Sequence, residues 1–542
     1  MSSTHSTFSV GVPGLKSAPV SSEAPGPWRR AGAVPSRGPV LVTGTGSKPA
    51  WTAERLRTFV RSTFPGERVI VLANREPVMH ERSHEDGAIV ARQPSSGVVT
   101  ALEPLTLACG GVWVAHGSGL ADRDVVDTRD GLELSRDGSS YRLRRVWLSR
   151  AEEQGYYYGF ANSALWPLCH LAHVKPVFRL EDLEHYRLVN DRFASAVCDE
   201  ADTAAPVVLI QDYHVALAPL GSRRRLPQAT TVLFWHIPWP NRHRFAICPW
   251  RTELLEGLLG SSVLGFQTAT DCQNFLETVQ HCLEAQVDRE TSTITYNGRR
   301  VLIGTYPISI EWPSHLSDAV PSVSECRRQV RHRLGVTDDA LLTVGVDRLD
   351  YTKGLEEKMS GVERLLEGRP DLRRRFVLAQ VASPSRSDID SYRDCAGRVR
   401  DAAERVNRRF GDADYRPIVL LEENWAPRDV FLLMRAAEAC CVTSLHDGMN
   451  LVAKEFAAAR DDEQGVLVLS PFAGASRELP EALAVNPYDA HALADALARA
   501  VTMPPDEQRW RLAAMRQTVA RDNAYRWAAR MLQDAGRVRA RA

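Results

Sequence analysis

The stretch Thr443–Phe456, TSLHDGMNLVAKEF, decides the fold of this 542-residue chain. An apolar run ends at its first residues, and a turn follows through His446, Asp447 and Gly448. A helical pattern then begins and carries Glu455 on its first turns. A strand, a turn and a helix in this order point unpaired backbone N–H groups, and the positive end of a helix dipole, at the space above a sheet. We expect a phosphate there, and the two acidic residues favour a sugar nucleotide.

Apolar runs alternate with helical patterns on both sides of this stretch. The later strands are predicted at Leu341–Val346, Arg375–Val381, Ile418–Leu421, Ala439–Ser444 and Gly465–Leu469. The earlier strands are predicted at Arg68–Arg75, Val207–Gln211, Thr231–Trp235 and Val263–Phe266, with helices at 51–64, 184–200 and 271–283. Such alternation is typical of mainly parallel sheets covered on both faces. We therefore expect an α/β fold of two doubly wound halves, joined near residues 305–315, with a ligand site in the cleft between them.

The length favours two domains, because 542 residues exceed a single hydrophobic core. We predict a first Rossmann-like domain over residues 51–310 and a second over 311–542, whose last helix can pack back on the first. Residues 1–50 are rich in Ser, Gly and Pro and lack an apolar core segment. This composition predicts a disordered tail rather than a signal peptide.

Composition excludes several classes of function. The chain has 67 basic and 67 acidic side chains, so nothing in the total charge suggests a nucleic-acid partner. No apolar run reaches the roughly 18 residues that span a membrane. The ten cysteines are scattered without a C-x-x-C pair and are expected to be core thiols in a reducing cytoplasm. The charged helix at Arg398–Arg409 and the pair Asp461-Asp462 are both expected to be solvated.

Two cations stand at the end of a predicted strand. In Gly345–Gly354, Arg348 and Lys353 are five positions apart and can hold a diphosphate and neutralise it as it leaves. The alternative is that Arg348 pairs with Asp350 while Lys353 is solvated.

Two carboxylates complete the expected donor site. Glu455 can accept both hydroxyls of a ribose, and Asp447 can accept the hydroxyls of a donor sugar. The alternatives are a Glu on a helix surface paired with an Arg, and an Asp that caps backbone N–H groups in a turn.

Several segments together resemble the trehalose-6-phosphate synthases, glycosyltransferase family 20. In the second half these are residues 345–355, 444–456, 465–475 (GVLVLSPFAGA) and 485–489 (VNPYD). In the first half they are residues 74–75 (NR), 160–167 (FANSALWP), 211–214 (QDYH), 236–240 (HIPWP) and 264–268 (LGFQT). The resemblance covers residues 68–530 in family order and spacing. It implies a GT-B fold, in which two Rossmann-like domains face a central cleft, and transfer of glucose from a nucleoside-diphosphate glucose to glucose 6-phosphate.

The resemblance also implies a donor site in the second half. Arg348 and Lys353 match the residues that bind the diphosphate, and Asp447 matches the one that binds the glucose hydroxyls. The backbone and ribose contacts of the nucleotide fall on Leu451, Val452, Ala453, Lys454 and Glu455. Trp425 falls where the family contacts the base. Gly97 matches a glycine that closes over the diphosphate, and its neighbour Ser96 stands where glycine is usual.

For the acceptor, the resemblance implies a phosphate grip of Arg75 and Arg386, with a hydrogen bond from Tyr157. Asp212 and His236 match contacts to the sugar hydroxyls and the reacting region, and Trp166 offers an apolar wall. His214 has no such match and is interpreted as structural.

The implied reaction retains the anomeric configuration, with attack from the face that the diphosphate leaves. Arg348, Lys353, His236 and Asp212 are the expected catalytic residues. No metal and no cofactor are expected, because the cations do what magnesium does elsewhere and UDP-glucose is a co-substrate. The expected partners are these small molecules, without nucleic acid or membrane. A homo-oligomer is compatible with the sequence, and the expected location is the cytoplasm.

The chain departs from the family pattern at His446, where arginine is usual, and at His116, where tryptophan is usual. His116 falls near the expected acceptor pocket. The acceptor alternatives are glycerol 3-phosphate, because a related branch shares the run Arg75-Glu76-Pro77, and the cyclitols of pseudo-glycosyltransferases. A sugar-phosphate-sensing homologue without catalysis is the alternative to an enzyme.

Overall fold

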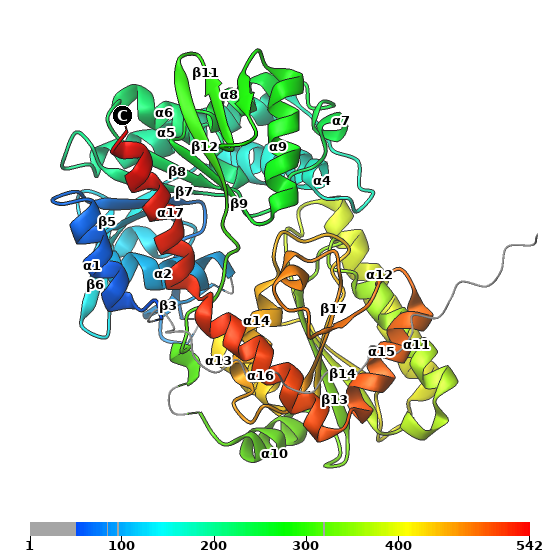
Figure 1. Cartoon of the computed structure of the whole chain (residues 1–542). Coiled ribbons are helices and arrows are strands. Elements are labelled where there is room, and N and C mark those ends of the chain that lie inside the picture. Colours follow the sequence, from blue (N-terminus) through cyan, green and yellow to red (C-terminus); the bar gives the residue numbers. More distant parts are fainter. Residues whose placement is uncertain (1–49, 84, 95–96, 318–319, 542) are drawn as a thin grey trace, which may run out of the picture. The chain divides into compact units, whose positions relative to one another are not determined.

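The computed structural model describes residues 50–541 except 84, 95–96 and 318–319 (Figure 1). The tail predicted over residues 1–50 therefore lies outside the described residues, apart from Ala50. Within the described part, two sheets carry the strands of the two halves.

The sheet of the first half has ten strands in the order β10-β11-β12-β9-β8-β7-β1-β4-β6-β5 among the described residues. They are β1 (Val69–Ala73), β4 (Val112–His116), β5 (Gly131–Arg136), β6 (Ser139–Val146), β7 (Val207–Gln211), β8 (Thr230–Phe234), β9 (Val263–Phe266), β10 (Gln286–Asp288), β11 (Thr293–Tyr296) and β12 (Arg299–Thr305). The strands from β12 to β6 run parallel, whereas β5, β10 and β11 are antiparallel edges. A separate hairpin joins β2 (Met79–Arg82) to β3 (Ile89–Arg92).

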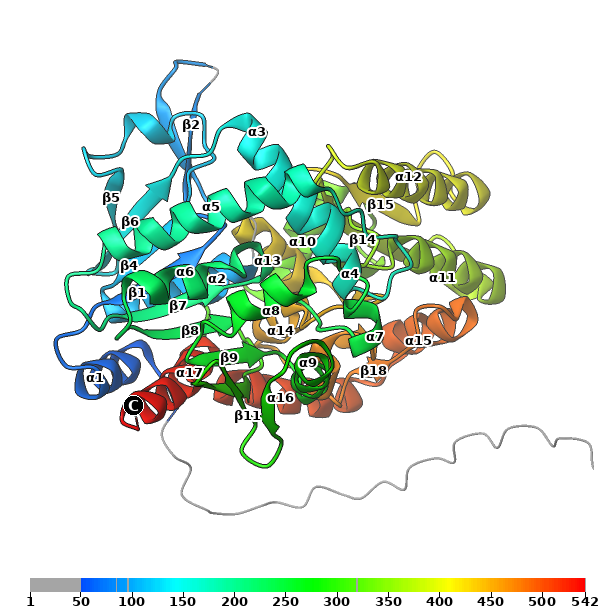
Figure 2. The same ribbon diagram turned by 90° about the horizontal axis from the view of Figure 1, so that it is seen from above.

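The central strands β1, β7 and β8 are buried along their whole length, because helices cover both faces of this sheet. The helices of the first half are α1 (Ala53–Thr63), α2 (Gly97–Cys109), α3 (Arg150–Glu153), α4 (Trp166–Cys169), α5 (Leu180–Asp199), α6 (Ala218–Arg225), α7 (Arg242–Phe245), α8 (Arg251–Leu258) and α9 (Ala269–Cys282). Figure 2 shows α5, α6 and α8 together on one side of the strands. A π-helical segment, Gln154–Leu165, joins α3 to α4, and such segments often occur at functional sites.

The sheet of the second half is parallel throughout and has the order β15-β14-β13-β16-β17-β18. Its strands are β13 (Leu341–Arg348), β14 (Phe376–Ser383), β15 (Ile418–Leu421), β16 (Ala439–Val442), β17 (Val466–Leu469) and β18 (Leu483–Ala484). Its helices are α10 (Val323–Leu334), α11 (Leu355–Gly368), α12 (Asp390–Phe410), α13 (Pro427–Ala436), α14 (Leu451–Ala459), α15 (Ala490–Thr502) and α16 (Pro505–Arg521). The predicted α/β class is confirmed, and β13 extends two residues further than predicted, through Arg348 itself.

The last helix, α17 (Ala524–Arg539), contacts α1, α2 and β8 of the first half. Asn523 caps its start, and the Ala524 N–H donates to the Ile310 carbonyl at 2.8 Å. Figure 1 shows α16 and α17 as one red path from the second sheet to the first. The domain boundaries at residues 50 and 310 stay a prediction.

Gly354, which begins α11, has a φ of 63° and faces the neighbouring strand. A Cβ there would lie 2.1 Å from the Thr443 carbonyl oxygen, whereas a Cβ at Gly335, with φ 64°, would meet nothing within 4 Å. We expect Gly335→Ala to lower the free energy of unfolding by about 1 kcal/mol, because an alanine is strained in the left-handed region. Gly354→Ala should lower the free energy of unfolding clearly more, and the thermal midpoint with it. Equal midpoints for the two variants would contradict this packing.

Candidate active site

Two arginines meet over one buried carboxylate at the carboxyl ends of β13 and β14. The register pairs Arg348 with Ser383, so Arg386, three residues later, lies at the same edge of the sheet. Asp350 is fully buried, and its Oδ2 lies 3.4 Å from Arg348 Nη2 and 3.5 Å from Arg386 Nη1. The predicted alternative of an Arg348–Asp350 pair is therefore present, yet the Arg348 side chain remains 40% exposed and available to a ligand.

Aromatic residues of the first half cover these arginines. The guanidinium of Arg386 lies 4.2 Å from the Trp166 ring centre and that of Arg348 lies 5.4 Å from it. Arg386 Nη2 also donates to the Tyr213 hydroxyl at 3.1 Å. Burial would raise the pKa of Tyr157, but Arg386, Arg75 and Arg348 outweigh it and lower that pKa below 10. The cluster is therefore built to receive negative charge.

Arg75 follows β1 and is exposed, at the carboxyl end of the first sheet. Its charge lowers the pKa values of Tyr157 and His214, as that of Arg386 does. His214, interpreted as structural from the sequence, stacks on Tyr157 with ring centres 5.5 Å apart.

Asp212 and His236 end adjacent strands, β7 and β8. Asp212 has a φ of 78°, and its Oδ1 accepts the Tyr213 and His236 N–H groups at 2.9 and 3.3 Å. Burial raises the pKa of Asp212 to about 7 and lowers that of His236 to about 3. His236 is thus a neutral imidazole at pH 7, with Nε2 2.9 Å from Gln211 Oε1.

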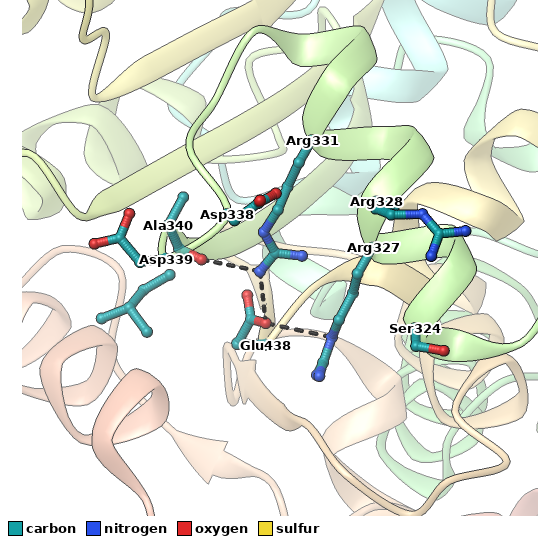
Figure 3. Close-up of a pocket in the computed structure, with 9 residues that line it drawn as sticks. Ser324, Arg327, Arg328, Arg331, Asp338, Asp339, Ala340 and Glu438 are labelled. Carbon is teal, nitrogen blue, oxygen red and sulfur yellow. Dashed lines mark hydrogen bonds and ion pairs between the residues drawn. The ribbon is translucent and has the colours of Figure 1, made fainter.

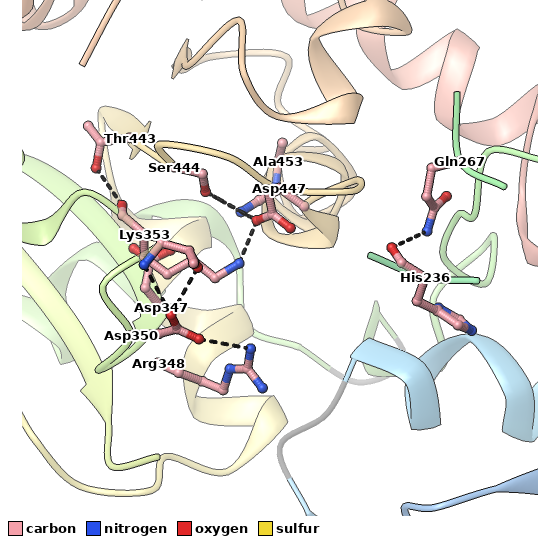
Figure 4. Close-up of polar contacts among 12 residues, drawn as sticks. His236, Gln267, Asp347, Arg348, Asp350, Lys353, Thr443, Ser444, Asp447 and Ala453 are labelled. Atoms are coloured by element: carbon pink, nitrogen blue, oxygen red, sulfur yellow. Dashed lines mark hydrogen bonds and ion pairs between the residues drawn. The ribbon is translucent and has the colours of Figure 1, made fainter. Parts of the chain in front are cut away.

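Lys353 and Asp447 form an ion pair in the second half (Figure 4). Lys353 Nζ lies 2.5 Å from Asp447 Oδ2, and the Ser444 hydroxyl and Asn450 amide donate to the same oxygen at 3.1 and 3.3 Å. Burial would raise the pKa of Asp447, but Lys353 overrides it and holds that pKa at about 2. The predicted alternative of a solvated Lys353 is wrong, because the Asp447 carboxylate is within reach.

Helix α14 begins beside this pair, as predicted. The Asn450 side chain caps it by accepting from the Ala453 N–H at 3.2 Å. Leu451 and Val452 come first in the helix, where N–H groups have no intrahelical acceptor. The Lys454 side chain is buried and donates to the Ile308 carbonyl and to Glu478, so only its backbone can face a ligand. Glu455 has no hydrogen-bond partner among the described residues, and burial raises its pKa to about 7.

The remaining predicted donor residues are Gly97, Ser96 and Trp425. Gly97 begins α2, and a Cβ there would lie 3.1 Å from Leu451 Cδ1, so the two halves meet at this point. Ser96 lies outside the described residues. The Trp425 ring is buried under the guanidinium of Arg333, 4.0 Å from its centre, and lines a cavity of about 230 Å³. Its contact with a base stays a prediction.

The two departures from the family pattern have different surroundings. His446 Nδ1 accepts from the Leu171 N–H at 3.1 Å, so this residue ties the turn to the first half. His116 ends β4 and is buried, and its pKa is lowered to about 4, first by burial and then by Arg75.

Sequence reasoning missed three residues that organise the site. Asp350 appeared only as an alternative partner of Arg348, although it also holds Arg386. Tyr213 lies between Arg386 and Asn162, and Asn450 caps α14. All three lie inside the segments quoted above. The feature of the sequence that could have identified them is a polar side chain at the end of a strand or at the start of a helix.

The expectation of a solvated Asp461-Asp462 pair holds for Asp461, whose side chain is 56% exposed, but both carboxylates are also ion-paired. Asp461 pairs with Arg435 at 2.8 Å, and Asp462 with the fully buried Arg460 at 2.9 Å. Both arginines extend from helix ends into the interior, and buried guanidinium groups require carboxylate partners. The charged helix α12 does carry its arginines at the surface, as predicted. All ten cysteines are free.

A cavity of about 400 Å³ lies at the opposite edge of the second sheet, beside α10 (Figure 3). Its Arg331 and Arg327 share Glu438, with contacts of 3.0 and 3.5 Å. Because ligands of doubly wound sheets bind at carboxyl ends, we do not assign this cavity to the active site.

Two other features have no candidate in the described part of the chain. No helix there is long and apolar enough to cross a membrane. No cluster of three or more His, Cys, Asp or Glu there is suited to a metal ion.

Comparison with known proteins matches the model of glycosyltransferase family 20 to residues 67–537. The chain belongs to this family. A trehalose-6-phosphate synthase of Mycobacterium avium (strain 104) is 37% identical over 477 residues, covering 86% of this chain and 95% of the relative.

Solved structures of family 20 proteins agree with the GT-B fold. An E. coli structure described as bound with UDP-2-fluoro glucose is 29% identical, with a TM-score of 0.75, and covers 86% of this chain and 99% of its own. The UDP-forming α,α-trehalose-phosphate synthase of Burkholderia xenovorans in complex with glucose-6-phosphate is 29% identical, with a TM-score of 0.74 and coverage of 86% and 99%.

The raised pKa of Glu455 predicts that the stability of the folded chain depends on pH. The carboxyl has a pKa of about 7 when folded and an ordinary value of 4.5, so the folded chain binds more protons than the unfolded one between these values. Stability therefore falls as pH rises from about 4.5 to 7, by at most about 3 kcal/mol. Glu455→Gln should raise the thermal midpoint relative to the parent at pH 8 but not at pH 4.5. The same difference at both pH values would contradict the raised pKa.

Proposed function

We propose that this chain is a retaining glucosyltransferase that moves glucose from UDP-glucose to glucose 6-phosphate and releases α,α-trehalose 6-phosphate and UDP. The observation that carries the proposal is the cluster of Arg348, Arg386 and Tyr157 beside the start of α14. Relatives named trehalose-6-phosphate synthase, and the structures with UDP-2-fluoro glucose and glucose-6-phosphate, support the same substrates.

In this proposal the donor lies on the second half. Arg348 and Lys353 bind the diphosphate, together with the first-turn N–H groups of α14. Glu455 accepts the ribose hydroxyls, and its lack of a partner among the described residues supports this role. Asp447 accepts hydroxyls of the glucose, and its contact with Lys353 supports a donor whose sugar and diphosphate lie next to each other. Gly97 lies over this region from the first half.

The acceptor lies between the halves. Arg75 and Arg386 bind its phosphate, since a guanidinium fork suits phosphate oxygens, and Tyr157 adds a hydrogen bond. Asp212 and His236 contact the sugar hydroxyls. Trp166 forms the wall, and the same ring supports the guanidinium groups of Arg348 and Arg386.

The chemistry follows from this arrangement. An acceptor hydroxyl bonds to the anomeric carbon from the face that the diphosphate leaves, and the bond from that carbon to the phosphate oxygen breaks. The departing phosphate takes the hydroxyl proton, while Arg348 and Lys353 stabilise its charge. His236, a neutral imidazole with a pKa of about 3, serves as a hydrogen-bonding group and not as an acid. We propose that no metal or cofactor takes part, because these cations neutralise the diphosphate.

We further propose a cytoplasmic location, which the ten free cysteines support. The partners proposed are small-molecule substrates, without nucleic acid or membrane, and self-association into a homo-oligomer is compatible with the sequence.

An acceptor screen with UDP-glucose tests the product. We expect UDP release to be fastest with glucose 6-phosphate and much slower with glycerol 3-phosphate or free glucose, because Arg75 and Arg386 require a phosphate and Asp212 and His236 require hexose hydroxyls. A preference for glycerol 3-phosphate would overturn the product but not the donor. Absence of turnover with every acceptor would favour a sensing protein.

Arg348→Ala tests the donor assignment. Loss of a charge-assisted contact to the leaving diphosphate should lower kcat at least about 100-fold, measured as UDP release. Arg369→Ala is a matched control, because the Arg369 side chain is equally 40% exposed and is also ion-paired, to Asp371. The control should keep normal turnover. Near-normal turnover of Arg348→Ala would refute its role.

A further inference from the structure

A buried charged network lies directly behind Arg75, and neither the resemblance nor the proposed reaction uses it. Its members are Arg145 at the end of β6, Glu76 and Asp122, all three with 0% exposure, and His80. Arg145 Nε donates to Glu76 Oε2 at 2.9 Å, and Arg145 Nη2 lies 2.8 Å from Asp122 Oδ1. One guanidinium therefore joins two carboxylates without solvent.

The remaining atoms of the network are also engaged. Glu76 Oε1 accepts the Ser118 N–H and hydroxyl at 2.7 and 2.9 Å. Asp122 Oδ1 accepts the His80 N–H at 2.8 Å, and Asp122 Oδ2 accepts the Gly119 N–H at 2.7 Å. Arg145 donates to the carbonyls of Asp122 and Val78, both at 3.0 Å. Because the hydrogen bonds of this buried network are satisfied by fixed partners, its side chains have a single arrangement.

His80 is the fourth charged or titratable member. Its Nδ1 lies 2.9 Å from Arg145 Nη2 and 3.1 Å from Asp122 Oδ1. This nitrogen can accept from the guanidinium or donate to the carboxylate, but not both. Burial raises the pKa of Glu76 above its ordinary value, whereas the Ser118 N–H and the Arg145 guanidinium favour its charged form.

The network joins three segments that meet at the acceptor side. Residues 74–80 carry Arg75, residues 116–122 begin with His116, and β6 supplies Arg145. The two loops are further joined by the His116 N–H, which donates to the Asn74 carbonyl at 3.2 Å. Arg75 is exposed while its neighbour Glu76 is buried, so fixing Glu76 fixes the backbone from which the Arg75 side chain extends.

We infer that Arg145, Glu76, Asp122 and His80 are positioning residues that hold Arg75 for the phosphate of the acceptor. The inference rests on the proposed function, in which Arg75 binds that phosphate. A hydrophobic cluster of equal volume would stabilise the fold as well or better. The ionic network additionally fixes the orientation of the loop of residues 74–80, because hydrogen bonds and ion pairs, unlike apolar contacts, are directional.

A double-mutant cycle tests this role. Glu76→Gln keeps the shape of the side chain but removes the charge that binds Arg145. We expect it to raise the KM for glucose 6-phosphate at least tenfold, with the KM for UDP-glucose and kcat changed less than twofold. In an Arg75→Ala background the same substitution should change the acceptor KM less than twofold. The reason is that the effects of two substitutions do not add when one residue acts through the other.

Glu438→Gln is the matched control, because it removes a carboxylate paired with the buried Arg331 in the second half, beside α10. It should leave both KM values unchanged. If Glu76→Gln does not fold, Arg145→Lys, which keeps the charge but loses the fork, takes its place with the same expectations. An acceptor KM that stays normal, or rises equally in the Arg75→Ala background, would overturn the inference. A parent enzyme without turnover on glucose 6-phosphate would instead refute the proposed function.

Discussion

The carboxylate of Asp350 is the constraint on which the rest of the site depends. It is fully buried, and its Oδ1 accepts the N–H and hydroxyl of Thr352, both at 3.0 Å, while its Oδ2 faces Arg348 and Arg386. Burial would raise the pKa of this carboxyl, but the two arginines keep it below 3.8. A permanent negative charge at this point allows two guanidinium groups to approach each other at the end of a sheet.

One carboxylate does not balance the cations around it. Arg75, Arg348 and Arg386 together lower the pKa of the Tyr157 phenol and press that of His214 well below 6.5, after burial has done the larger part. The contribution of the arginines to both shifts indicates a positive potential at two different side chains. The site thus favours anions on both of its sides, which is what a reaction between a sugar phosphate and a sugar diphosphate requires.

The sequence predicted the parts of this arrangement that depend on local pattern. Apolar runs located five of the six second-half strands to within a few residues, and the polarity of Arg348, Asp447 and Glu455 at strand and helix ends placed them at one edge. The sequence did not predict β4, β5, β6, β10, β11, β12, β18 and the β2–β3 hairpin. All of these except β4 are only partly buried or exposed and so give no long apolar run.

Partners distant in the chain could not be predicted either. Asp461 pairs with Arg435, which lies 26 positions earlier in the chain. The network of Glu76 and Arg145 joins residues 69 positions apart. Spacing carries no information about such pairs, because tertiary packing alone decides which buried charges meet.

The Trp166 ring contacts both the arginine proposed for the donor and the arginine proposed for the acceptor. The ring lies in the first half, yet it contacts the guanidinium groups of Arg348 and Arg386 in the second. A cation held against an aromatic face loses freedom to turn. Asp350 contacts the same two arginines, so each guanidinium is held by a carboxylate as well as by a ring. A shift of the first half against the second would therefore change the surroundings of the arginine proposed for the donor and of the arginine proposed for the acceptor together.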